Sequence, residues 1–334
     1  MNKIKLNSLL LFLLLFFCPI YSQDNSAEKE VIKKHLNQAV VDFSDANYDK
    51  ALESSKQALV NAFAINDDLL ISQSYNTIGA IFNECSETSK AIEFYNKALV
   101  YAKKLNNDKM FNWIYSNLGS VYYFNDIDVP KGISYYKKSL FYAVKIKDTA
   151  QIEYTKLNLA SAYFAINKYD LGNQQINDIK EQILKNDNQE AKMSLHLLLG
   201  IYDSNNNQKA KGEEHFFIAK TIAEQNGLDS FLINVYENLV KHYKKHQEIE
   251  NAQLYQEKLD SLNKIVYSED KIDNLKKAAT QIELQEYKIQ LGKVEKENEA
   301  QQKTLKDSKL IVILFIVILI ILLLLLLTLY KNIK

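Results

Sequence analysis

Two histidines on one predicted helix are the side chains in this sequence best suited to metal chemistry. His242 and His246 stand at positions i and i+4 of the segment HYKKH, a spacing that places both imidazoles on one helix face. The segment lacks the glutamate of H-E-x-x-H, and no further ligand is evident. We therefore predict no metal site and interpret the pair as solvated histidines beside Lys244 and Lys245.

The other motifs that would indicate catalysis are missing. The sequence has no G-x-S-x-G, no glycine-rich phosphate loop and no Cys/His zinc spacing. Of its two cysteines, Cys18 and Cys85, only Cys85 remains if the N-terminus is removed, so no internal disulfide can form. The 41 basic and 41 acidic residues cancel, which argues against a nucleic-acid partner. We predict a non-enzymatic protein without cofactors.

The elements that must position any functional residue are repeated helix pairs, best seen in residues 75–99. Large residues there follow helical spacing on both sides of a short polar turn. The small residues Gly79, Ala91 and Ala98 allow the helices to approach closely. This pattern resembles the tetratricopeptide repeat (TPR), W-x₂-L-G-x₂-Y…A-x₃-F-x₂-A, with Tyr75 in the tryptophan place.

The pattern returns along the chain at steps of 40, 40, 41, 40 and 40 residues. The small position of the first helix is occupied by Ala39, Gly79, Gly119, Ala160, Gly200 and Val240. The single extra residue falls in the turn of the third repeat, near Pro130. We predict an all-α fold, a right-handed TPR helical solenoid of about six helix pairs over residues 28–265. The alternative is a non-repetitive helical bundle.

The N-terminus has the form of a secretory signal peptide. Two lysines precede an unbroken apolar run at residues 9–17, and Ser22 offers a small residue for cleavage. Residues 1–22 are therefore predicted to be a signal peptide. Lipidation of Cys18 and an uncleaved signal anchor are the alternatives.

Two different segments follow the last repeat. Residues 266–308 are polar, with two short apolar seams at a/d spacing, and predict a helical stalk with a weak coiled coil. These seams allow a homodimer through the stalk, and a single solvated helix is the alternative. Residues 310–330 are apolar apart from Thr328 and Tyr330, and are long enough to span roughly 30 Å. They predict a transmembrane helix embedded in the lipid bilayer.

Together, these segments predict a single-pass protein of the cell (inner) membrane. The repeats are expected on the periplasmic or extracytoplasmic side, and residues 331–334 form a cytoplasmic tail. The order of segments resembles bacterial TPR-containing membrane signalling proteins, in which a histidine kinase or a helix-turn-helix output domain follows the membrane helix. This chain lacks that output domain, so we expect a stand-alone relative or a partner whose output lies on another chain.

The resemblance also implies a concave groove lined by the first helices. Groove positions lie six, three and two residues before the small residue and four after it. The candidate peptide-binding residues there are Asn76, Trp113, Asn117, Tyr123, Tyr154, Asn158, Phe164 and Asn238. An amide offers a donor and an acceptor to bound peptide backbone, and aromatic residues are favoured at interfaces. The alternatives are repeat consensus for the amides and inter-repeat packing for the aromatic residues.

These observations predict a membrane-anchored module that binds a protein or peptide ligand in its groove. The alternative is a sensor component that relays ligand binding to a separate cytoplasmic kinase or transcriptional regulator.

Overall fold

The structure, a computed structural model, divides into two units, Met1–Lys271 and Ile272–Lys334. The residues that it describes are 25–44, 47–85, 87–125, 127–266 and 269–333. The predicted signal peptide at residues 1–22 lies outside them.

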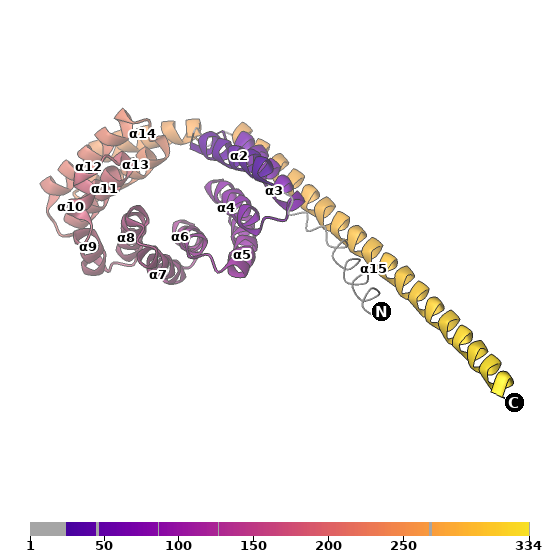
Figure 1. The fold of residues 1–334 in the computed structure, drawn as a ribbon. Coiled ribbons are helices and arrows are strands. Elements are labelled where there is room, and N and C mark those ends of the chain that lie inside the picture. The colour runs from indigo at the N-terminus through magenta and orange to yellow at the C-terminus, as the bar shows by residue number, and fades with distance from the viewer. Residues whose placement is uncertain (1–24, 45–46, 86, 126, 267–268, 334) are drawn as a thin grey trace. The chain divides into compact units, whose positions relative to one another are not determined.

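Six successive helix pairs make up the first unit (Figure 1). The pairs are α2 (Ser26–Ser44) with α3 (Tyr48–Ala64), α4 (Asp68–Glu84) with α5 (Thr88–Leu105), α6 (Asp108–Phe124) with α7 (Val129–Lys145), α8 (Thr149–Ala165) with α9 (Tyr169–Asn177) and α10 (Lys180–Lys185), α11 (Gln189–Asn205) with α12 (Lys209–Gln225), and α13 (Asp229–Lys245) with α14 (Ile249–Val266). The described residues contain no strand, so the prediction of an all-α repeat fold is confirmed.

Asp or Asn residues define where most of the first helices begin. The Asp67 carboxylate accepts hydrogen bonds of 3.0 and 3.1 Å from two backbone N–H groups of α4. Asn107, Asp148 and Asn188 cap α6, α8 and α11 in the same way. Just before Asp67, Asn66 takes a left-handed backbone conformation, with φ of 52°, which asparagine tolerates better than most residues. The Asn and Asp residues in these loops therefore end one pair and start the next.

Glycines in the first helices allow close packing within a pair. A Cβ on Gly79 would lie 2.8 Å from the Tyr95 ring, and one on Gly200 would lie 2.7 Å from the Phe216 ring. Real Cβ atoms essentially never approach other heavy atoms this closely. The ring of the second helix therefore occupies the space that a side chain would need, as the small residues of the repeat pattern predict.

The first helices of neighbouring pairs lie close to one another along the whole row. They approach in the order α2 to α4, α4 to α6, α6 to α8, α8 to α11 and α11 to α13. A row of pairs curves toward the side on which its helices are most closely spaced, so the first helices line the concave side. Figure 1 shows α4, α6 and α8 on the inner side of the row and α5, α7 and α9 on the outer side. We call the inner surface of α4, α6 and α8 the groove face.

The second unit consists of most of α15 (Glu269–Ile333), which is one continuous helix of 65 residues. The apolar side chains at residues 310–320 of this helix are exposed. Among the residues that the structure describes, no helix is long and apolar enough to cross a membrane.

This finding contradicts the predicted localisation. The transmembrane helix at residues 310–330 and the single-pass topology, with external repeats and a cytoplasmic tail at residues 331–334, are therefore not retained. The homodimer through residues 266–308 is untested by the structure of one chain and stays a prediction.

Candidate functional site

Two amides from neighbouring first helices meet on the groove face. Asn117 Nδ2 on α6 donates a hydrogen bond of 2.9 Å to Asn76 Oδ1 on α4. Two turns further along, Asn125 Nδ2 donates a hydrogen bond of 3.0 Å to Asn83 Oδ1. All four side chains are half-buried. The structure thus brings together two predicted site residues, Asn76 and Asn117, and adds a second amide pair beside them.

Sequence reasoning missed the second amide pair, Asn125 with Asn83, although the position of Asn83 in the repeat could have indicated it. Asn83 stands four residues after Gly79, a position that the TPR resemblance already assigns to the groove. The interpretation of that position considered only aromatic residues.

Asn158 on α8 occupies the place of Asn117 in the next repeat. Its Nδ2 atom is buried and has no hydrogen-bond partner of good geometry among the described residues. One turn earlier, Tyr154 is 47% exposed. Burial of the hydroxyl raises the pKa of Tyr154, and the neighbouring Asn158 and Ser120 side chains offset part of this rise. The groove face therefore holds a buried amide beside a partly exposed ring.

Two of the predicted groove aromatics take part in packing. The Tyr123 hydroxyl lies 2.7 Å from Ser161 Oγ on the next first helix. Burial raises the pKa of Tyr123, and this hydrogen bond partly offsets the rise. Phe164 is 5% exposed and packs over Gly172 and Tyr169 in the core of the fourth pair. Inter-repeat packing therefore describes Tyr123. Phe164 packs both within its own pair and against Tyr202 of the next pair, with ring centroids 6.2 Å apart.

The two remaining predicted residues, Trp113 and Asn238, differ in whether their side chains are available to a ligand. Trp113 is half-buried, and Lys109 Nζ lies 4.8 Å from the centroid of its ring. Asn238 Nδ2 donates a hydrogen bond of 2.8 Å to the Asn234 carbonyl oxygen of its own helix. Trp113 therefore extends the groove face on α6, whereas the Asn238 donor is already used within α13.

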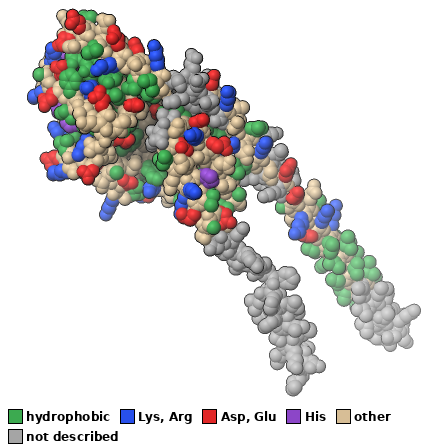
Figure 2. Space-filling view, turned by 90° about the horizontal axis from the view of Figure 1, so that it is seen from above, with side chains coloured by type: hydrophobic (Ala, Val, Ile, Leu, Met, Phe, Trp, Pro, Cys, Tyr) green, Lys and Arg blue, Asp and Glu red, His purple; other side chains and the backbone are tan. Residues whose placement is uncertain are grey.

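The predicted groove residues suit the recognition of uncharged groups, and Lys109 adds one positive charge beside Trp113. The eight predicted residues are amides and aromatic rings without a formal charge. Figure 2 shows acidic and basic side chains intermixed over the visible face of the repeats. Amide donors and acceptors match the backbone groups of an extended peptide, and partly exposed rings accept its apolar side chains.

The His242–His246 pair departs from the predicted solvated pair. His242 is 2% exposed, its Nδ1 atom lies 2.8 Å from Ser204 Oγ on α11, and the two imidazole centroids are 4.7 Å apart. Burial lowers the pKa of His242, and His246 lowers it further. In the described part of the chain, no group of three His, Cys, Asp or Glu side chains could hold a metal ion. His242 therefore packs between the fifth and sixth pairs.

Comparison with solved structures addresses the fold. The apo form of RapI superposes with a TM-score of 0.59 at 13% identity, over 70% of this chain and 84% of RapI. A Rap protein complexed with competence and sporulation factor gives 0.53 at 14% identity, over 70% and 74% of the two chains. A signal-transduction ATPase with a tetratricopeptide repeat sensor from Pyrococcus horikoshii gives 0.50 at 14% identity. This chain has a TPR-like helical fold.

These similarities show that the fold is TPR-like, and they show nothing about function. The match to the Pyrococcus horikoshii protein covers 79% of this chain but 44% of that larger protein. No family model and no curated protein matches the sequence. The resemblance to bacterial membrane signalling proteins therefore stays a prediction from sequence.

Proposed function

We propose that this TPR-like protein is a non-catalytic binding module that holds an extended segment of a partner protein on the groove face. The hydrogen bond from Asn117 to Asn76 is the observation that carries this proposal, because it aligns amides from successive first helices along one line. Asn158 continues the line on α8 with a buried donor that lacks a partner of good geometry.

The spacing of the amides suits an extended chain. Packed helices lie about 8–10 Å apart, and an extended peptide rises about 3.3 Å per residue. One amide would therefore meet the peptide about every three residues. The partly exposed rings of Trp113 and Tyr154 lie on the same two helices as Asn117 and Asn158 and would contact the side chains between these points. A neutral segment with regularly spaced apolar residues fits these groups.

The comparisons lend general support to a binding role. The similar Rap structure was solved in complex with competence and sporulation factor, so a related fold holds a partner. The alternative of a sensor that relays binding to a separate kinase or regulator rests on the order of sequence segments alone, and we do not develop it.

A selection from a random peptide library with the full-length chain would test the proposal. Peptides that bind the groove face should lose about tenfold or more in affinity to the double variant Asn117→Ala/Asn158→Ala, because each amide supplies about one hydrogen bond. Asn251→Ala is a matched control, since Asn251 is exposed on the second helix α14 and its amide donates a hydrogen bond to the nearby Glu248. Equal affinity of the selected peptides for the double variant and the wild type would exclude the groove face as their site.

A further inference from the structure

The second helices α5 and α7 carry a concentration of positive charge that the rest of this neutral chain does not share. Their sequences, TSKAIEFYNKALVYAKKL and VPKGISYYKKSLFYAVK, contain eight lysines and one glutamate. The second helices α3, α12 and α14 instead mix acidic and basic residues in nearly equal numbers. Overall, the chain has no net charge. The excess is therefore local to the outer side of the second and third pairs.

Aromatic rings hold many of these lysines in place. On α7, Lys131 Nζ lies 4.1 Å from the centroid of the Tyr122 ring, and Lys138 Nζ lies 5.1 Å from that of Tyr135. The arrangement recurs one repeat earlier, where the equivalent lysines lie 41 residues lower in the sequence. The equivalent contacts there are Lys90 with Phe82 at 5.6 Å, Lys97 with Phe94 at 4.6 Å and Lys104 with Tyr101 at 4.3 Å. Ammonium groups ordered in this way lose less conformational entropy when a partner binds.

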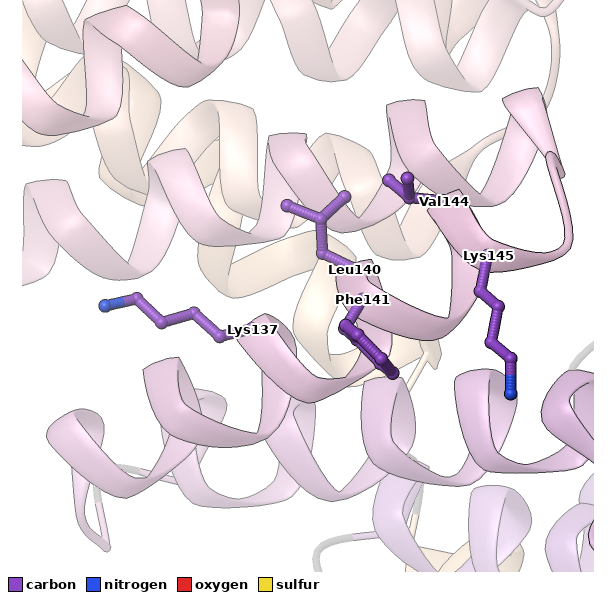
Figure 3. A pocket seen from close by; sticks show the side chains of 5 residues that line it. All are labelled: Lys137, Leu140, Phe141, Val144 and Lys145. Atoms are coloured by element: carbon purple, nitrogen blue, oxygen red, sulfur yellow. The ribbon is translucent and has the colours of Figure 1, made fainter.

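An apolar hollow lies among the lysines of α7. It has a volume of about 400 Å³ and is lined by Lys137, Leu140, Phe141, Val144 and Lys145 (Figure 3). Phe141 is 63% exposed and Val144 is 55% exposed. Large apolar side chains exposed together on a helix are typical of an interaction site.

We propose that the outer face of α7 docks an acidic segment of a partner protein that carries one large apolar anchor residue. The anchor would fill the hollow against Leu140, Phe141 and Val144, and flanking carboxylates would face Lys137 and Lys138. Charge complementarity selects the acidic partner, and the apolar lining selects a protein side chain over a phosphate backbone, which offers no group to fill such a hollow. This surface is separate from the groove face, which lies on the first helices.

Acidic side chains of the protein itself already neutralise part of the charge. Asp108 lies 2.9 Å from Lys145 Nζ, and Asp68 lies 3.7 Å from Lys104 Nζ. Lys137 and Lys138 are exposed, and α7 contains no acidic residue. These two lysines therefore provide most of the charge available to a partner beside the hollow.

Fluorescence anisotropy with the full-length chain would test the docking surface. The probe is a short labelled peptide in which glutamates flank a single tryptophan, and its affinity should fall as salt concentration rises. We expect Phe141→Ser and the double variant Lys137→Glu/Lys138→Glu each to weaken binding by about tenfold or more. Leu254→Ser and Lys211→Glu are matched controls, because both residues are exposed on other second helices and should leave binding unchanged.

Four outcomes would overturn the proposal. The first is failure of the wild-type chain to bind the peptide. The second is that the lysine variants weaken binding while Phe141→Ser does not, which would indicate diffuse charge attraction. The third is tighter binding of a single-stranded oligonucleotide or a phosphatidylserine vesicle through the same lysines. The fourth is loss of binding in Asn117→Ala/Asn158→Ala, which would place the peptide in the groove; retained binding there keeps the two surfaces distinct.

Discussion

Gly119 lies directly against the ring of Tyr136, so that a Cβ on Gly119 would come within 2.6 Å of Tyr136 Cδ1. Tyr136 is fully buried, and its hydroxyl lies 3.0 Å from Ser120 Oγ. The ring is therefore fixed at both ends and cannot turn aside to admit a methyl group. This contact joins the two helices of the third pair, and Gly79 with Tyr95 repeats it in the second pair.

We expect Gly119→Ala to destabilise the protein by about 1–3 kcal/mol, because the added methyl group overpacks a rigid contact. Gly292→Ala is the control, since a Cβ at that helical position would meet no described atom within 4 Å apart from the nearby backbone of its own helix. There alanine should stabilise the helix by about 0.5–1 kcal/mol, because it restricts the unfolded chain more than glycine does. Urea denaturation of both variants would show opposite shifts, and a stable Gly119→Ala protein would contradict the packing described here.

The sequence predicted the helix pairs well because small and large residues recur with a fixed period, and close packing depends on their sizes. It could not predict the break between α9 and α10, where Ile176, Ile179 and Ile183 keep a helical spacing although the helix is interrupted at Asp178. For the site, the position of Asn117 in the repeat was enough to predict that its amide lies on the groove face. Phe164 also stands at a predicted groove position, but its ring is buried in the core. The spacing of residues along the sequence does not show in which direction a side chain points.

The cap at Asp67 gives a second prediction. Burial raises the pKa of the Asp67 carboxyl, but backbone hydrogen bonds from α4 and the contact with Lys29, at 3.0 Å, outweigh it and hold the pKa below its usual value. The resulting stability is present above about pH 4 and is lost as the pH falls through the lowered pKa. Asp67→Ala should destabilise the protein by about 1 kcal/mol at neutral pH, because α4 loses its cap.

The variant Asp67→Asn separates the contribution of the helix cap to stability from that of the carboxylate charge. Asparagine caps helices about as well as aspartate, and Asn107 already does so for α6. This variant should therefore keep most of the stability at neutral pH while losing the contribution of Asp67 to acid sensitivity. Thermal melting of both variants at neutral and acidic pH would check this, and equal losses in the two would show that the ion pair, rather than the cap, stabilises α4.

The hydrogen bond between Tyr123 and Ser161 provides a third prediction, which bears on the site. Tyr123→Phe should destabilise the protein by about 0.5–1.5 kcal/mol, because Ser161 loses a half-buried partner. Ser161→Ala should have a similar effect, and the two changes together should cost less than their sum. A double-mutant cycle measured by urea denaturation would give this coupling. Additive losses would show that Tyr123 does not act through Ser161.

Two histidines replace a stacked tyrosine pair in the fifth repeat. His196 and His215 occupy the places that Tyr115 and Tyr135 hold in the third repeat, and their Nδ1 atoms lie 3.0 Å apart. Burial lowers the pKa of His196 to about 4, and His215 and then Lys180 add to this shift. Burial also lowers the pKa of His215, although the nearby Asp203 carboxylate and Glu214 oppose the shift.

This pair makes the fifth repeat sensitive to acid. The unfolded chain takes up protons near the usual histidine pKa of about 6.5, whereas folded His196 does so only near 4, so acidification favours unfolding between these values. Stability should therefore be full above about pH 6.5 and fall toward about pH 4. The variant His196→Tyr/His215→Tyr restores the residues of the third repeat and should flatten this fall, leaving the part due to buried His242.

Melting temperatures measured from neutral pH to about pH 4 would test this, with His35→Tyr as the control, because His35 lies outside the fifth repeat. The control should keep the pH dependence of the wild type. A double variant that loses as much stability on acidification as the wild type would assign the acid sensitivity to other groups. A flattened profile would show that the fifth repeat contributes much of the acid sensitivity, through histidines at two positions where the third repeat has stacked tyrosines.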